Sequence, residues 1–261
     1  MAFDWTSLRK PAPASLLAAR ETAHCAAQAL ARAARANLAP APDDSHSALL
    51  WGPKVKAIVT QALPKDARAG LDVAKLELVF WSGGREERGG PDGKWLDAKL
   101  AAAGLEPASG VKLPYDLPKK ELKKDDGLAA LERWLAAAAD LLAEVRARHQ
   151  ALHPGPVYLW PHHFDIATLL AVSKEKSIGV GISMGDDFYA QPYAYVSPYP
   201  SPRVDPSAPK LPPLPRGGHW HTEEFFGAVA TADELLAQPD PRAACLAVIE
   251  AAIEASKKWL A

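Results

Sequence analysis

Two apolar runs joined by a short polar segment constrain the fold of this chain more than any other feature of the sequence. Phe164–Val172 and Ser177–Met184 are rich in aliphatic residues, and the segment Ser173–Ser177 contains only Ser, Lys and Glu. Such runs with so short a connection are typical of a β-hairpin. Because side chains alternate between the two faces of a strand, the register of this hairpin decides which residues meet.

With Ser173–Ser177 as the loop, Val172 pairs with Ile178, and one face of the hairpin is bulky and apolar. The opposite face carries small residues and ends in acidic and imidazole side chains. A glycine-lined strand face means that something approaches the backbone closely, either a packed helix or a ligand. For the ligand interpretation we expect a shallow pocket with the following residues at its floor and rim: His163, Asp165, Gly181, Gly185, Asp187, Tyr193 and Tyr195.

A second candidate site is the segment 217–224, whose sequence is GGHWHTEE. If this segment is extended, His219, His221 and Glu223 share one strand face, which is a plausible three-ligand set for zinc or iron. The alternative is that the two histidines are loop residues at the edge of the sheet, because short His pairs are weak signals.

The order of the remaining elements indicates the fold class. Helical patterns cover Ser15–Asn37, the segment after Asp126, and the C-terminus after Asp240, while Leu71–Trp81 and Gln191–Ser197 are predicted strands. Helices and strands therefore come in blocks and do not alternate regularly. We predict an α+β fold, mainly antiparallel sheet with packed N-terminal, central and C-terminal helices. We expect a single domain over residues 1–261, with a division into two lobes near residue 150 as the alternative.

Charge and composition exclude several classes of partner. The chain has 30 Lys and Arg against 31 Asp and Glu, which gives a net charge of -1. This balance does not indicate the excess of positive charge that is typical of nucleic-acid-binding proteins. No apolar run is long enough to span a membrane. The two cysteines, Cys25 and Cys245, do not form a disulfide framework. We therefore expect a cytoplasmic protein that binds neither nucleic acid nor membrane, and whose partner is a small molecule or another protein.

Three motifs carry a resemblance to a known family. They are LWPHHFDIA at 159–167, DDFYAQPYAYVSPYP at 186–200 and EEFFGAV at 223–229. In these the chain resembles a bacterial family that is known as a domain of unknown function. The resemblance implies one continuous domain in a bacterial, cytoplasmic protein, and it implies no activity or cofactor. It favours Asp165 for a role shared by the family, whereas His162, His219 and His221 are peculiar to this chain.

Two functions from different classes follow from these residues. The first is a binding or regulatory module that holds a small ligand or a partner on the glycine-lined face. The alternative is a metal-assisted, hydrolase-like enzyme in which His163, Asp165, His219, His221 and Glu223 act as ligands or acid–base groups. A purely structural role is a third interpretation. We favour the binding module, because each catalytic signal has a simpler structural explanation.

Overall fold

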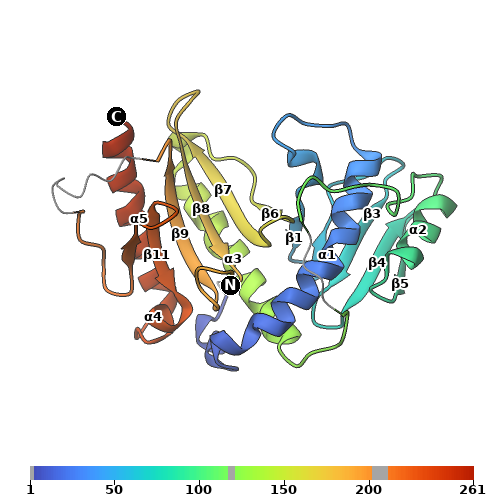
Figure 1. Cartoon of the computed structure of the whole chain (residues 1–261), viewed down its shortest axis with the longest axis horizontal. Coiled ribbons are helices and arrows are strands. Elements are labelled where there is room, and N and C mark those ends of the chain that lie inside the picture. The colour runs from blue at the N-terminus through green and yellow to red at the C-terminus, as the bar shows by residue number, and fades with distance from the viewer. Residues whose placement is uncertain (1–2, 117–120, 202–210) are drawn as a thin grey trace. The chain divides into compact units, whose positions relative to one another are not determined.

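The computed structural model describes residues 3–116, 121–201 and 211–261, and it divides the chain into two compact units. Unit 1 comprises 1–14, 137–157 and 165–261, and unit 2 comprises 15–136 and 158–164. Each unit contains an antiparallel sheet with packed helices (Figure 1). The predicted α+β class with antiparallel sheet is therefore confirmed.

Unit 2 is built on a five-stranded sheet in the order β1-β2-β3-β4-β5. Its strands are β1 (Leu50–Gly52), β2 (Ala57–Val59), β3 (Arg68–Asp72), β4 (Glu77–Ser82) and β5 (Arg85–Gly89). The alanine-rich helix α1 (Leu17–Asn37) packs on β3, and α2 (Gly93–Ala102) packs on β4 (Figure 1). Because alanine side chains are small, α1 buries a broad apolar face close to the sheet.

Unit 1 contains the antiparallel strands β10-β11-β9-β8-β7, in that order. Their bounds are β7 (Asp165–Ala171), β8 (Ser177–Ser183), β9 (Tyr193–Tyr199), β10 (His219–His221) and β11 (Gly227–Thr231). The C-terminal helix α5 (Pro241–Leu260) packs on β8, β9 and β11, after the short helix α4 (Ala232–Leu236). The long helix α3 (Leu128–Arg148) begins in unit 2 and ends in unit 1, and β6 (Tyr158–Trp160) belongs to unit 2.

Helix positions agree with the sequence predictions, and their caps explain why. Asp240 accepts a hydrogen bond from the Ala243 amide (3.0 Å) at the start of α5, with Pro241 in the first turn. Thr231 and Glu234 form a capping box at the start of α4. The number of independently folding domains stays a prediction.

The predicted single strand Leu71–Trp81 is wrong, because the structure divides it between β3 and β4. Asp72 ends β3 and accepts a hydrogen bond from the Lys75 amide (3.1 Å), and Leu76 has a φ of 53°. Hydrophobic periodicity does not show where a polar side chain caps a turn. The apolar run therefore looks like one strand, although it contains the turn of a hairpin. The charged strand β5 was not predicted for the opposite reason, since it has no apolar alternation.

The hairpin β7–β8 forms, but its register differs by two residues from the prediction. Leu170 pairs with Ile178, and Ala167 pairs with Gly181, because the loop begins at Val172. A shift of two leaves every side chain on its predicted face. The pairing stops at Asp165–Ser183, and Phe164 has a φ of 56°, so the strand does not continue to His163. The predicted pair of His163 with Asp187 therefore does not form.

The register gathers most candidate residues of unit 1 on one face of its sheet. Asp165 pairs with Ser183, Gly181 with Tyr195, and Tyr195 with Val229, whose partner on β10 is His219. The same alternation places Tyr193 and His221 on this face. Val196, Ala228 and Trp220 lie on the opposite face, where Trp220 contacts Trp259 of α5. We call the face with Asp165, Tyr195 and His219 the polar face.

The ring of Tyr195 fills the space above Gly181. A Cβ added to Gly181 would lie 2.5 Å from the Tyr195 ring and hydroxyl and 2.8 Å from the Ala167 Cβ. Tyr195 is held in place, because its hydroxyl donates a hydrogen bond to the Asp165 carboxylate. Gly181 therefore accommodates an internal aromatic ring, and it does not form the floor of an open pocket.

We predict that Gly181→Ala lowers the free energy of unfolding by about 1–3 kcal/mol, because the new methyl group forces Tyr195 off its position. Gly179→Ala is the matched control on the same strand. Its added Cβ meets nothing closer than 3.7 Å, so we expect a change below about 0.5 kcal/mol. Urea denaturation of both variants measures the difference, and equal effects would contradict the packing described.

Candidate functional site

Two histidines on the polar face converge on one tyrosine hydroxyl. Tyr189, in the segment between β8 and β9, has its hydroxyl 3.0 Å from His219 Nε2 and 2.8 Å from His221 Nδ1. The outer nitrogens of both rings are also engaged, His219 Nδ1 with Glu234 (3.1 Å) and His221 Nε2 with the Glu223 carbonyl (2.5 Å). We call Tyr189, His219, His221 and Glu234 the Tyr189 cluster.

Tyr189 reaches the histidines because Asp186 folds the preceding segment into a turn. One Asp186 oxygen accepts hydrogen bonds from the amides of Phe188 (3.0 Å) and Tyr189 (3.2 Å). The other accepts from the Tyr193 hydroxyl (2.5 Å) and the Ser183 hydroxyl (3.3 Å). Sequence reasoning named Asp187 and missed Asp186. An Asp side chain commonly accepts hydrogen bonds from the amides two and three residues later, which forms an Asx-turn. This tendency is the sequence signal that could have identified Asp186.

Burial holds the tyrosines of this face in their protonated form. Burial, followed by the charge of Asp165, raises the pKa of Tyr195. Burial and the hydrogen bond to Asp186 raise the pKa of Tyr193. These hydroxyls therefore act as hydrogen-bond donors at neutral pH, and they hold the carboxylates of Asp165 and Asp186 in place.

Other predicted residues of the two sites lie elsewhere. Asp187 is exposed, and Gly185 has a φ of 101° with the backbone of Tyr189 3.3 Å from the position of a Cβ. Gly185 therefore serves the turn. β10 ends at His221, so the extended geometry that would place Glu223 on the face of the histidines is absent. His221 contacts the Glu223 carbonyl, while the Glu223 side chain is exposed.

His163 lies in unit 2, in a group of aromatic rings. Its ring centroid is 4.2 Å from that of His162, which is 5.7 Å from that of Tyr115. Burial, together with the charge of His163, lowers the pKa of His162 to about 4. The His162 ring is therefore neutral at physiological pH.

His24 lies buried beside this group. Its Nε2 donates a hydrogen bond to the Pro161 carbonyl (2.8 Å), and its ring stacks on Phe164 with centroids 5.1 Å apart. The other nitrogen, Nδ1, is buried and has no partner among the described atoms. Burial lowers the pKa of His24 to about 4. The hydrogen bond to the Pro161 carbonyl raises this pKa, but its effect is smaller.

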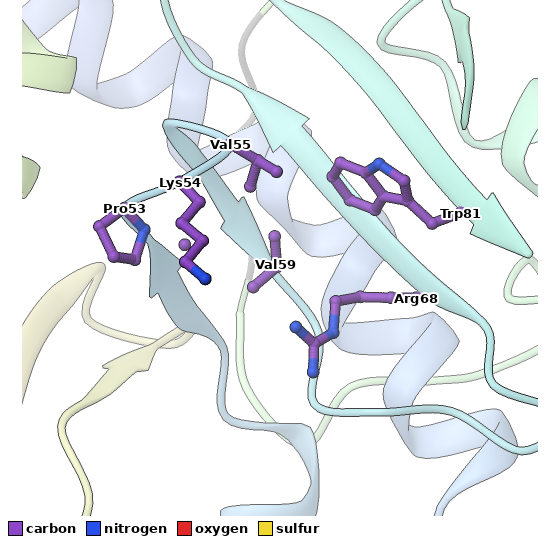
Figure 2. Close-up of a pocket in the computed structure, with 7 residues that line it drawn as sticks. Pro53, Lys54, Val55, Val59, Arg68 and Trp81 are labelled. Atoms are coloured by element: carbon purple, nitrogen blue, oxygen red, sulfur yellow. The ribbon is translucent and has the colours of Figure 1, made fainter. Parts of the chain in front are cut away.

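A pocket of about 500 Å³ opens on the sheet of unit 2, at residues that the sequence predictions did not include. It is lined by Gly52, Pro53, Lys54, Val55, Val59, Arg68 and Trp81 (Figure 2). Arg68 and Trp81 are cross-strand partners on β3 and β4, and Val59 lies on β2. Lys54 and Val55 come from the turn between β1 and β2. Two cations face this pocket, and none of its described lining residues is acidic.

The wall of the pocket depends on a glycine beneath a large ring. A Cβ on Gly70 would lie 2.7 Å from the Trp81 ring, so the indole packs against β3 at this glycine. The indole N–H donates a hydrogen bond to Glu86 (2.8 Å), which fixes the ring. Trp81 ends the predicted strand Leu71–Trp81, and Gly70 precedes that strand. The turn between β3 and β4, which the sequence analysis does not predict, brings the two residues together.

Among residues 3–116, 121–201 and 211–261, no group of three or more His, Cys, Asp or Glu side chains is arranged to hold a metal ion. Within the same residues, no helix combines the length and apolar character needed to span a bilayer. Comparison with protein-family models, characterised proteins and solved structures finds no match to this chain. The family resemblance and the bacterial origin therefore stay predictions.

We predict that the buried neutral His24 makes folding stability fall at acidic pH. Its pKa is 6.5 in the reference state and about 4 in the fold, so the unfolded chain takes up a proton first as pH falls. The contribution of His24 is fully present above pH 6.5 and is lost between 6.5 and about 4, by up to roughly 3 kcal/mol.

Urea denaturation across this pH range measures the effect. His24→Gln keeps a hydrogen-bond donor for the Pro161 carbonyl but removes the group that titrates. We therefore expect the free energy of unfolding of this variant to depend less on pH. His153→Asn is the control, because His153 lies outside the buried group. A pH dependence that is the same in wild type and His24→Gln would contradict the role of His24.

Proposed function

We propose that the chain is a cytoplasmic binding protein whose pocket in unit 2 holds a small organic anion with an apolar or aromatic body. The observation that carries the proposal is the pairing of Arg68 and Lys54 with Trp81, Val55 and Val59 around one space. A volume of about 500 Å³ is typical of small-molecule pockets, which span roughly 300–1,000 Å³.

The charge of the pocket supports an anionic ligand. Figure 2 shows the Lys54 ammonium and the Arg68 guanidinium on the side of the pocket away from the Trp81 ring, with Val59 between them. Neither cation has an acidic partner within the described part of the chain. A guanidinium can bind a carboxylate or phosphate through two parallel hydrogen bonds, and the flexible lysine adds a second charge.

The apolar walls support a ligand that is larger than a simple ion. The indole of Trp81 offers a flat surface held in place by Gly70 and Glu86. Val55 is 39% exposed, which leaves apolar area for a ligand to cover. An inorganic anion would contact the two cations but would leave the apolar walls exposed to solvent. Aryl or branched acyl carboxylates and phosphates match both parts of the pocket.

A thiol in the core supports the proposed location in the cytoplasm. Cys245 forms no disulfide bond. Burial raises the pKa of Cys245 to about 12, so this thiol is an inert part of the core of unit 1. A reduced cysteine in the core fits a reducing compartment. The alternative function, a metal-assisted hydrolase, requires a metal site on the polar face.

We predict that benzoate or phenyl phosphate binds the protein, whereas uncharged benzamide and inorganic phosphate bind more weakly. Arg68→Gln should lower affinity by about ten- to a hundredfold, because a hydrogen bond to a charged group is lost. Trp81→Leu should weaken both organic anions and leave the preference for charge unchanged. Isothermal titration calorimetry measures each affinity.

Arg85→Gln is the matched control, since Arg85 is an exposed arginine on β5 that does not line the pocket. It should bind like wild type. Equal affinity for benzamide and benzoate, or an Arg68→Gln variant that binds like wild type, would refute the proposed anion site.

A further inference from the structure

The Tyr189 cluster brings three atoms that can coordinate a transition-metal ion close together. Three potential donor atoms meet on the polar face: the Tyr189 oxygen, His219 Nε2 and His221 Nδ1. Donors about 2.0–2.1 Å from a tetrahedral zinc ion lie about 3.3 Å from one another. The observed oxygen–nitrogen distances of 3.0 and 2.8 Å are a few tenths of an ångström shorter. Small rotations of the side chains would therefore open room for the ion.

The outer nitrogens of the two histidines have the partners that metal-binding histidines have. A ligating histidine nearly always donates its remote N–H to a carboxylate, a backbone carbonyl or water, and this fixes its orientation. His219 Nδ1 faces the Glu234 carboxylate at 3.1 Å, and His221 Nε2 faces the Glu223 carbonyl at 2.5 Å. Both partners are acceptors only, so both outer nitrogens carry the proton. The inner nitrogens, Nε2 of His219 and Nδ1 of His221, then face the Tyr189 oxygen.

The supports of this arrangement are themselves anchored. Glu234 accepts hydrogen bonds from the amide (2.8 Å) and hydroxyl (2.7 Å) of Thr231 through its other oxygen. The ring of Phe225 stacks on His221 with centroids 4.0 Å apart. A helix cap therefore anchors the partner of His219, and an aromatic contact supports His221.

The Tyr189 hydroxyl has one proton, so it can donate a hydrogen bond to only one of the two inner nitrogens at a time. A metal ion placed among the three atoms would be coordinated by the Tyr189 oxygen and by both nitrogens.

We infer that Tyr189, His219 and His221 form a binding site for a divalent first-row transition metal, with Zn²⁺ as the ion it takes most readily. Imidazole nitrogen and an anionic oxygen are suitable zinc ligands. Glu223, which the sequence analysis assigned as the third ligand, is replaced by Tyr189. Three protein ligands leave a fourth tetrahedral position open for water or a substrate, as in catalytic zinc sites. On binding, the Tyr189 hydroxyl loses its proton to solvent and becomes a phenolate.

Titration of untagged, chelator-free full-length protein with Zn²⁺ at neutral pH tests the site. Calorimetry should show one ion per chain, and wild-type protein should develop the near-ultraviolet difference absorption of a tyrosinate in step with binding. Tyr189→Phe should abolish that absorption and weaken binding. His219→Ala and His221→Ala should each lower affinity at least about tenfold, and Glu234→Gln by about ten- to a hundredfold.

His153→Asn, which changes a histidine of unit 1 outside the cluster, should bind Zn²⁺ like wild type. Melting temperatures without metal identify any variant that fails to fold, and the tyrosinate signal of the wild-type protein needs no variant. The inference is overturned if no stoichiometric binding occurs, if the histidine variants bind like wild type, or if Zn²⁺ binds without a tyrosinate signal.

Discussion

Large aromatic rings that lie on strand glycines hold both candidate sites together. Tyr195 covers Gly181 in unit 1, and Trp81 covers Gly70 in unit 2, each at a distance that leaves no space for a Cβ. A glycine weakens a strand because it has no side chain to pack, and an aromatic ring from the neighbouring strand restores the lost contacts. Each ring is then fixed at its polar end, by Asp165 for Tyr195 and by Glu86 for Trp81.

This interaction has different consequences in the two units. In unit 1 the ring closes the glycine-lined face, and its hydroxyl anchors a buried carboxylate. In unit 2 the ring stands as one wall of a pocket, because the opposite side is formed by the turn that carries Lys54 and Val55. The same local packing therefore produces a filled surface in one sheet and an open one in the other.

The sequence predicted those parts of the fold that depend on periodicity and on capping. The faces of β7 and β8 were predicted correctly even though their partners differ by two residues, because alternation tolerates an even shift. The sequence-based predictions were wrong or incomplete where a polar side chain determines the path of the backbone. Asp72 breaks one apolar run into two strands, and Asp186 folds the segment that carries Tyr189.

The candidate sites were only partly predictable for a related reason. His219 and His221 share a face because they are two residues apart on one strand, which the sequence shows directly. Their contact with Tyr189 depends on a turn and on strand order, which spacing does not contain. The pocket in unit 2 depends on four separate segments. In the sequence, nothing distinguishes Lys54 and Arg68 from other surface cations. In the structure, the hairpins bring both of them to the same pocket.

The most direct test of the proposed function locates the ligand on the protein. Spectra of isotope-labelled indole N–H groups resolve the tryptophans, of which the chain has eight, while phenyl phosphate is added. If the pocket binds the organic anion, the Trp81 signal shifts in proportion to occupancy, and the indoles of Trp134 and Trp259, which do not line the pocket, stay in place. A Trp81 signal that does not move while the ligand binds would contradict the account.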